Sequence, residues 1–82
     1  MPAPDVSAVD TELDATGLNC PMPLLKAKQA LNRMQVGEVL RVKATDPGSE
    51  RDFEVFARQS GHELLSATRD DHLFVYLLRK TA

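Results

Sequence analysis

The order of apolar patterns in this 82-residue chain predicts an α/β (α+β) two-layer sandwich, with two helices packed on one face of a four-stranded mixed sheet. Two segments carry apolar residues at helical spacing, and four others alternate as strands do. Turn residues separate these segments in the order β-α-β-α-β-β. Because a chain of this length forms one core, we expect a single domain over residues 11–82. Residues 1–10 contain two prolines and no periodicity, and they are expected to form a disordered N-terminal tail.

The first strand is expected at Thr11–Ala15, and the first helix from Pro21 to Met34 or Gln35. The helix is indicated by a single apolar stripe at positions i, i+3, i+7 and i+10, which consists of Leu24, Ala27, Leu31 and Met34. Gly37 is expected to end this helix or to lie in the turn after it.

A second strand is expected at Glu38–Thr45, where polar and apolar residues alternate. The turn cluster Asp46-Pro47-Gly48-Ser49 then opens a second helix, with Asp46 or Ser49 as its N-cap. The buried face of this helix is expected to hold Phe53, Phe56 and Ala57, and Gly61 is expected to stop it.

The last two strands are expected at Glu63–Arg69 and His72–Lys80, joined by a hairpin at Asp70-Asp71. Leu73–Leu78 is apolar at every position, which is typical of a strand in the centre of a sheet. With both helices on one face, the other face of the sheet exposes some apolar side chains. That open face is a candidate surface for a partner or for self-association.

The single cysteine, Cys20, lies directly before two alternating prolines in Asn19-Cys20-Pro21-Met22-Pro23-Leu24. Proline is tolerated in the first turn of a helix because the N–H groups there have no intrahelical acceptor. Pro21 and Pro23 are therefore predicted at the first and third helical positions, with Cys20 as the N-cap or its neighbour. The N–H groups of Met22 and Leu24 are then expected to point towards the sulfur.

A helix N-terminus carries roughly half a positive charge and lowers the pKa of a thiol beside it from about 8.5. We therefore expect Cys20 to be nucleophilic near neutral pH. The alternative is a buried, inert cysteine. The prolines and the polar Asn19 favour the reactive form, because they mark a junction between a loop and a helix. Lys26 and Lys28 follow on the helix, either as a solvated face or as a docking surface for an acidic partner.

Composition narrows the function classes further. One cysteine excludes an intrachain disulfide and an internal Cys-x-x-Cys redox cycle. His62 and His72 show no zinc-ligand spacing, so neither a metal nor another cofactor is expected. A net charge of −2 argues against direct binding of nucleic acid. No apolar run has the length of a membrane span and no signal peptide is visible, so a cytoplasmic protein is expected, most simply a monomer.

The motifs of this chain resemble those of the TusA/SirA-type sulfur-carrier family, whose hallmark is Cys-Pro-x-Pro. The resemblance covers Thr11 to Lys80. It rests on the run from Leu13 to Pro23 and on the later motifs Gly37-Glu38, Asp46-Pro47, Gly61-His62-Glu63-Leu64 and Arg79-Lys80. Two positions depart from the family pattern. Phe53-Glu54 stands where an Ile-Pro pair is usual, and Ala57 stands where some members have a second cysteine.

The resemblance implies a sulfur carrier that accepts sulfur as a persulfide on Cys20. It implies a cysteine desulfurase or a rhodanese-type protein as the donor, and a downstream protein as the acceptor. The pathways it suggests are tRNA thiolation, molybdenum-cofactor assembly and sulfur oxidation. It also implies that Asp46 lies at the same end of the sheet as the cysteine loop, where it would contribute to the partner surface.

The residues by themselves show no general base, no phosphate loop and no paired carboxylates, so a sulfurtransferase-type carrier fits better than a turnover enzyme. One alternative is a non-catalytic interaction or regulatory module that uses the open sheet face and has a structural cysteine. Another is a redox sensor, which the lack of a second cysteine disfavours.

Overall fold

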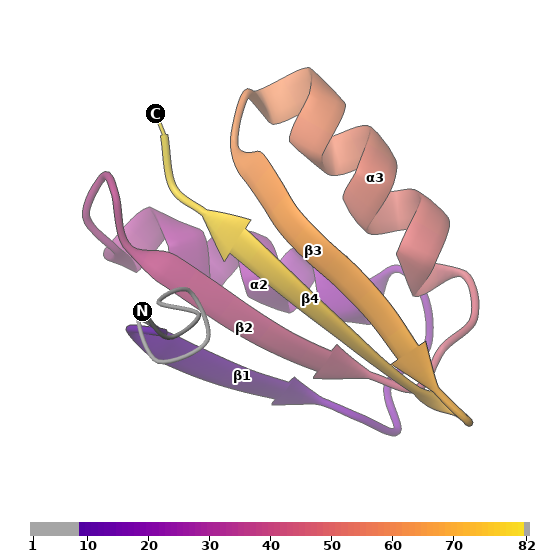
Figure 1. The fold of residues 1–82 in the computed structure, drawn as a ribbon. Helices are drawn as coiled ribbons and strands as arrows, with labels where there is room; N and C mark the ends of the chain where they lie inside the picture. The colour runs from indigo at the N-terminus through magenta and orange to yellow at the C-terminus, as the bar shows by residue number, and fades with distance from the viewer. Residues whose placement is uncertain (1–8, 82) are drawn as a thin grey trace, which may run out of the picture.

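The computed structural model describes residues 9–81 and contains the predicted elements in the predicted order (Figure 1). The strands are β1 (Thr11–Ala15), β2 (Val39–Ala44), β3 (Glu63–Asp70) and β4 (Leu73–Arg79). The helices are α2 (Met22–Arg33) and α3 (Ser49–Ser60). Residues 1–8 of the predicted tail lie outside the described residues. Asp10, also placed in that tail, pairs with β2: its N–H donates to the Val39 carbonyl, and its carboxylate accepts from the Val39 N–H.

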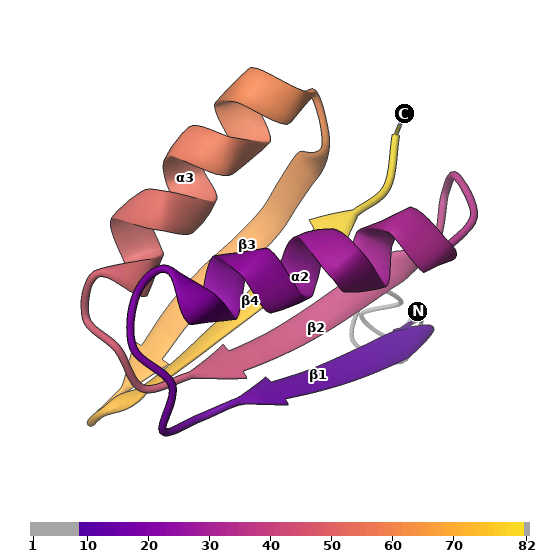
Figure 2. The same ribbon diagram turned by 180° about the vertical axis from the view of Figure 1, so that it is seen from behind.

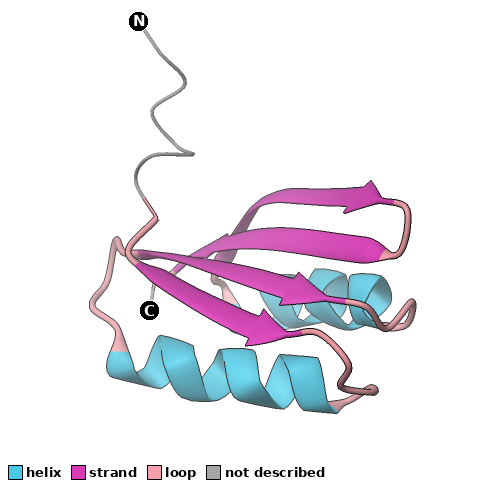
Figure 3. Cartoon of the chain, turned by 90° about the horizontal axis from the view of Figure 1, so that it is seen from below, coloured by secondary structure: helices cyan, strands magenta, loops and turns pink. Residues whose placement is uncertain are grey.

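The sheet is mixed and has the order β1-β2-β4-β3. β1 is parallel to β2, and β4 is antiparallel to both of its neighbours, β2 and β3. β4 is thus a central strand, as its apolar sequence predicted. Figure 3 shows both helices on the same side of the sheet. The predicted two-layer α+β sandwich is confirmed.

The core lies between the helices and the sheet, because the apolar stripe of each helix faces the same side of the strands. Its largest fully buried side chains are Tyr76, Phe53, Leu31, Leu40, Leu78 and Val42. Phe53 stacks on Tyr76 with ring centroids 4.5 Å apart, and this contact fixes the first turns of α3 on the central strand.

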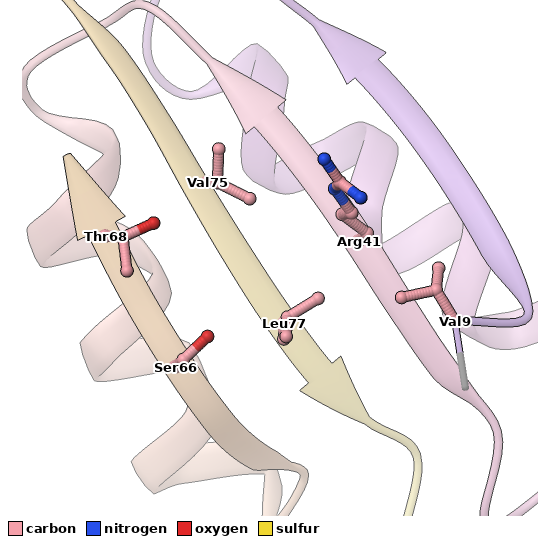
Figure 4. Close-up of a pocket in the computed structure, with 6 residues that line it drawn as sticks. All are labelled: Val9, Arg41, Ser66, Thr68, Val75 and Leu77. Carbon is pink, nitrogen blue, oxygen red and sulfur yellow. The ribbon is translucent and has the colours of Figure 1, made fainter. Parts of the chain in front are cut away.

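The open face of the sheet carries a shallow hollow of about 290 Å³ (Figure 4). Val75 and Leu77 are half-buried there, beside the hydroxyls of Ser66 and Thr68. Among the described residues, the Nε of Arg41 is buried without a hydrogen-bond partner. The open face therefore mixes apolar and polar groups.

Both helix starts differ in detail from the prediction. In α2 the N-cap position is Pro21, and Met22 and Pro23 are the first two helical residues, so the predicted positions of the prolines are one residue out. The N–H of Met22 donates to the Asn19 carbonyl at 2.8 Å and does not point at the sulfur, because the chain makes a turn there.

In α3 the N-cap is Gly48, so the prediction of Asp46 or Ser49 was wrong. The physical reason is that the Asp46 carbonyl, and not its carboxylate, accepts from the N–H and the hydroxyl of Ser49. At the other end of α3, Gly61 stops the helix with φ +86° and donates its N–H to Ala57. This stop was predicted, and the left-handed conformation is one that glycine adopts without strain.

Candidate functional site at the starts of the two helices

The starts of α2 and α3 meet at one end of the sheet, beyond the ends of β1 and β2 (Figure 2). The loop from β1 delivers Cys20 to this place, and the Asp46–Gly48 turn leads from β2 into α3. A built Cβ on Gly48 would lie 3.7 Å from the Cβ of Cys20 and 3.0 Å from Asp46 Oδ2. Glycine thus allows the second loop to pass close to the cysteine.

The Cys20 side chain is exposed, and its thiol donates a hydrogen bond to Oδ2 of Asp52. Asp52 lies in the first turn of α3, 32 residues further along the chain. Nothing local in the sequence joins the two positions, so the residues around Cys20 did not predict this contact.

The pKa of the Cys20 thiol is raised, most of all by its hydrogen bond to Asp52. Partial desolvation by the neighbouring loop and the negative charges of Asp52 and Asp46 raise it further. This is opposite to the predicted direction. The partial charge of a helix N-terminus is about half a unit, whereas each carboxylate carries a full negative charge, and one of them contacts the sulfur. The hydrogen bond and the two carboxylates therefore favour the protonated form of the Cys20 sulfur.

A buried anchor keeps the start of α3 in this position. The Ser49 side chain is buried, and its hydroxyl lies 2.7 Å from the hydroxyl of Tyr76 on β4. Burial raises the pKa of Tyr76, so the phenol stays protonated and available for this hydrogen bond. Because Phe53 also stacks on Tyr76, the turn that carries Asp52 is attached to the core on both sides.

A groove of about 170 Å³ runs between α2 and α3 beside Asp52. Lys28 lies over the ring of Phe56 at 5.5 Å and lines the groove. The groove is lined by Leu24, Lys28, Arg51, Asp52, Val55, Phe56 and Gln59.

Of the predicted docking residues, Lys28 lines the groove between α2 and α3, Asp46 lies by Cys20, and Lys26 is exposed outside the groove. Arg51 was missed, since an arginine on a solvated helix turn has no distinctive pattern.

The remaining predicted residues around the thiol have structural contacts. Pro23 is fully buried, Asn19 supplies the carbonyl that accepts from Met22, and Met22 itself is exposed. His62 contacts Phe56 and accepts a hydrogen bond from the Thr81 N–H.

Within residues 9–81, no group of histidine, cysteine and acidic side chains is arranged to hold a metal ion. None of the helices in that range is long and apolar enough to cross a membrane.

The family model described as sulfurtransferase TusA matches residues 11–80, almost the whole chain. The chain belongs to the TusA family. A sulfur carrier protein TusA from Allochromatium vinosum is 53% identical over 88% of this chain and 95% of its own length. Another from Pseudomonas putida is 45% identical, over 89% of this chain and 91% of its own length.

The fold is also found in a crystal structure of a SirA-like protein from Desulfitobacterium hafniense. The TM-score is 0.76, the identity is 23%, and the match covers 89% of this chain and 100% of the other. At that identity the likeness speaks for the fold alone. The family and the named relatives show that this TusA-family chain is a sulfur carrier, which in turn implies sulfur donor and acceptor proteins.

Proposed function

We propose that the chain carries sulfur as a persulfide on Cys20. The observation that supports this proposal is the exposed thiol of the single cysteine, placed where the starts of both helices meet, in a chain whose relatives are sulfur carriers. Thiolate attack on a donor persulfide is a thiol exchange reaction, which needs access to the sulfur and no cofactor. The residues that build the start of the helix around Cys20 are Asn19, Pro21, Met22, Pro23 and Leu24.

We infer that the donor is a cysteine desulfurase or a rhodanese-type protein and that a second protein receives the sulfur. The groove between α2 and α3 supports a docking surface at Lys28. Lys28 lines this groove together with Asp52, the residue that accepts the hydrogen bond from Cys20. Lys26 and Asp46 extend this surface in our proposal. The cytoplasm, where free thiols persist, is the compartment we propose, and tRNA thiolation, molybdenum-cofactor assembly and sulfur oxidation are the candidate pathways.

Intact-protein mass spectrometry tests the persulfide directly. The chain is incubated with a cysteine desulfurase and cysteine, beside the Cys20→Ser variant, and in parallel with a rhodanese fed with thiosulfate. We expect the native chain to gain one sulfur atom that a reductant removes, and the variant to gain none. If neither donor adds sulfur to the folded native chain, Cys20 is not a persulfide carrier for these donors. The interaction module that uses the open sheet face then becomes the better explanation.

A charge reversal at the groove tests the docking residues. Lys28→Glu is expected to slow loading from the protein donor while leaving the fold intact, because Lys28 is exposed. Arg33→Glu, on the same helix but outside the groove, is the matched control. Equal loading rates for both variants would contradict a docking role for Lys28.

A further inference from the structure

Asp52 is the only carboxylate that contacts the sulfur of Cys20 among residues 9–81, and it has no cation paired with it there. The ion pairs of that part of the chain are Arg41–Glu12, His72–Asp71 and Arg79–Glu63. The oxygen Oδ2 of Asp46 is buried without a hydrogen-bond partner in the same part of the chain, close to Gly48 and Cys20. The sulfur therefore lies beside two carboxylates that no basic side chain neutralises.

The other charged groups near the site are few. Arg51 on α3 and Lys28 on α2 line the neighbouring groove with Asp52, and Lys26 lies on α2. Glu50 belongs to the same first turn of α3 as Asp52. The charges that act on the ionisation of Cys20 are those of Asp52 and Asp46, and both favour the protonated sulfur.

We propose that Asp52 is a positioning residue that keeps Cys20 in the thiol form in the free chain, so that the sulfur is ready to attack only after this hydrogen bond is released. The proposal rests on the persulfide role of Cys20 and adds a control of its reactivity. Its geometric basis is the thiol-to-carboxylate hydrogen bond between two helix starts, held in place by the buried Ser49–Tyr76 and Phe53–Tyr76 contacts.

The transfer step balances without any outside oxidant. The S–H bond of Cys20 breaks once the hydrogen bond to Asp52 is released. The electron pair left on Sγ forms a bond to the outer sulfur of the donor's persulfide. The S–S bond of the donor breaks, and its electron pair stays on the donor's cysteine sulfur, which takes up the proton. Donor persulfide and Cys20 thiol become donor thiol and Cys20 persulfide.

The test is the pH profile of Cys20 alkylation by iodoacetamide in the native chain and in Asp52→Asn. Loss of the charge is expected to lower the pKa of the thiol, which raises the thiolate fraction at pH 7. Nucleophilicity falls with the pKa, but with a Brønsted coefficient near 0.5, so the variant is still expected to react faster than the native chain at pH 7. Above both pKa values the variant is expected to react more slowly, so the two profiles cross.

Glu50→Gln is the matched control, because it removes one negative charge from the same helix turn without touching the sulfur. Its profile is expected to follow that of the native chain. Asp52→Glu restores the charge and is expected to return the profile towards the native one. Superimposable profiles for Asp52→Asn and the native chain would falsify the proposal, since a merely structural acid at a helix start changes stability and not the ionisation of the thiol.

A measurement on the native chain covers the case in which Asp52→Asn does not fold. The carboxyl carbon of Asp52, followed by NMR, is expected to change its chemical shift at the pH where Cys20 ionises, and Cys20→Ser is expected to abolish that change. A carboxyl carbon in the native chain that does not respond at that pH would overturn the proposal. Neither experiment involves sulfur loading, so failure of the persulfide role and failure of the Asp52 role are separately visible.

Discussion

The two helix starts that meet at Cys20 are built in opposite ways. α3 begins with Glu50 and Asp52 in its first turn, and the buried Ser49 anchors it to Tyr76. α2 has no acidic residue in its first turn, and its exposed first residue is Met22. Neither helix has a side-chain cap. The positive end of α2 is thus left free for an anion, yet the sulfur beside it bonds to the acid of the other helix. The charge environment of a side chain at a helix start is decided by what packs across from it as much as by its own helix.

The largest expected effect comes from detaching α3. Phe53→Ala removes a fully buried ring that stacks on Tyr76, and it is expected to lower the free energy of unfolding by about 3–5 kcal/mol. Urea denaturation measures this loss. Val36→Ala, at a side chain that is 67% exposed, is the control and should change the free energy by less than about 0.5 kcal/mol. A loss at Phe53 as small as that of the control would mean that α3 is not held by this contact.

A smaller loss is expected from the polar anchor. Ser49→Ala leaves the Tyr76 hydroxyl without its buried partner and is expected to cost about 1–3 kcal/mol. Tyr76→Phe in the same background removes the unpaired hydroxyl. The double variant is therefore expected to lose less than the sum of the two single losses, which a double-mutant cycle measures. Strict additivity would show that the hydroxyls do not act as a pair.

Adding an acid to α2 makes the two helix starts alike. Met22→Glu is expected to stabilise the chain by about 0.3–1 kcal/mol, because a negative charge in the first turn interacts well with the helix. The same charge disfavours the Cys20 thiolate, so alkylation at neutral pH is expected to slow. Met22→Gln is the uncharged control, and both variants are compared by urea denaturation and iodoacetamide labelling. Faster labelling of the glutamate variant than of the glutamine variant would contradict the charge argument.

The smallest effect is a pH dependence. The Asp52 contact raises the pKa of Cys20, so the folded chain holds the thiol proton more tightly than the unfolded chain does. The resulting stabilisation is fully present below the pKa of the unfolded thiol, about 8.5, and is lost as the pH rises through the folded value. The stability of the native chain relative to Cys20→Ser is therefore expected to fall as the pH rises above about 8.5. A rise with pH in that range would mean that the helix N-terminus stabilises the thiolate after all. Tyr76 titrates in both chains, so its contribution cancels.

The elements of this fold follow from the sequence because each depends on contacts within a few residues or on a simple pattern. The stripe of Leu24, Ala27 and Leu31 predicted α2, and Gly61 predicted the end of α3, since a left-handed residue is required there. The uninterrupted apolar run of β4 predicted its central place in the sheet, because both faces of such a strand must be covered. Cys20 was likewise found from its own neighbourhood, as the one cysteine before two prolines.

The sequence by itself thus determined the secondary elements, the two-layer architecture and the candidate thiol. The tertiary structure alone decided which charged groups surround that thiol, and therefore the direction in which its pKa is shifted. Asp52 is 32 residues away, and only the packing of α3 against Tyr76 brings its carboxylate to the sulfur. The same packing places Asp46 and Gly48 beside Cys20, and Arg51 in the groove with Lys28. Periodicity describes which face of a helix is buried, but electrostatic interactions depend on distances between elements, and those distances exist only once the chain has folded.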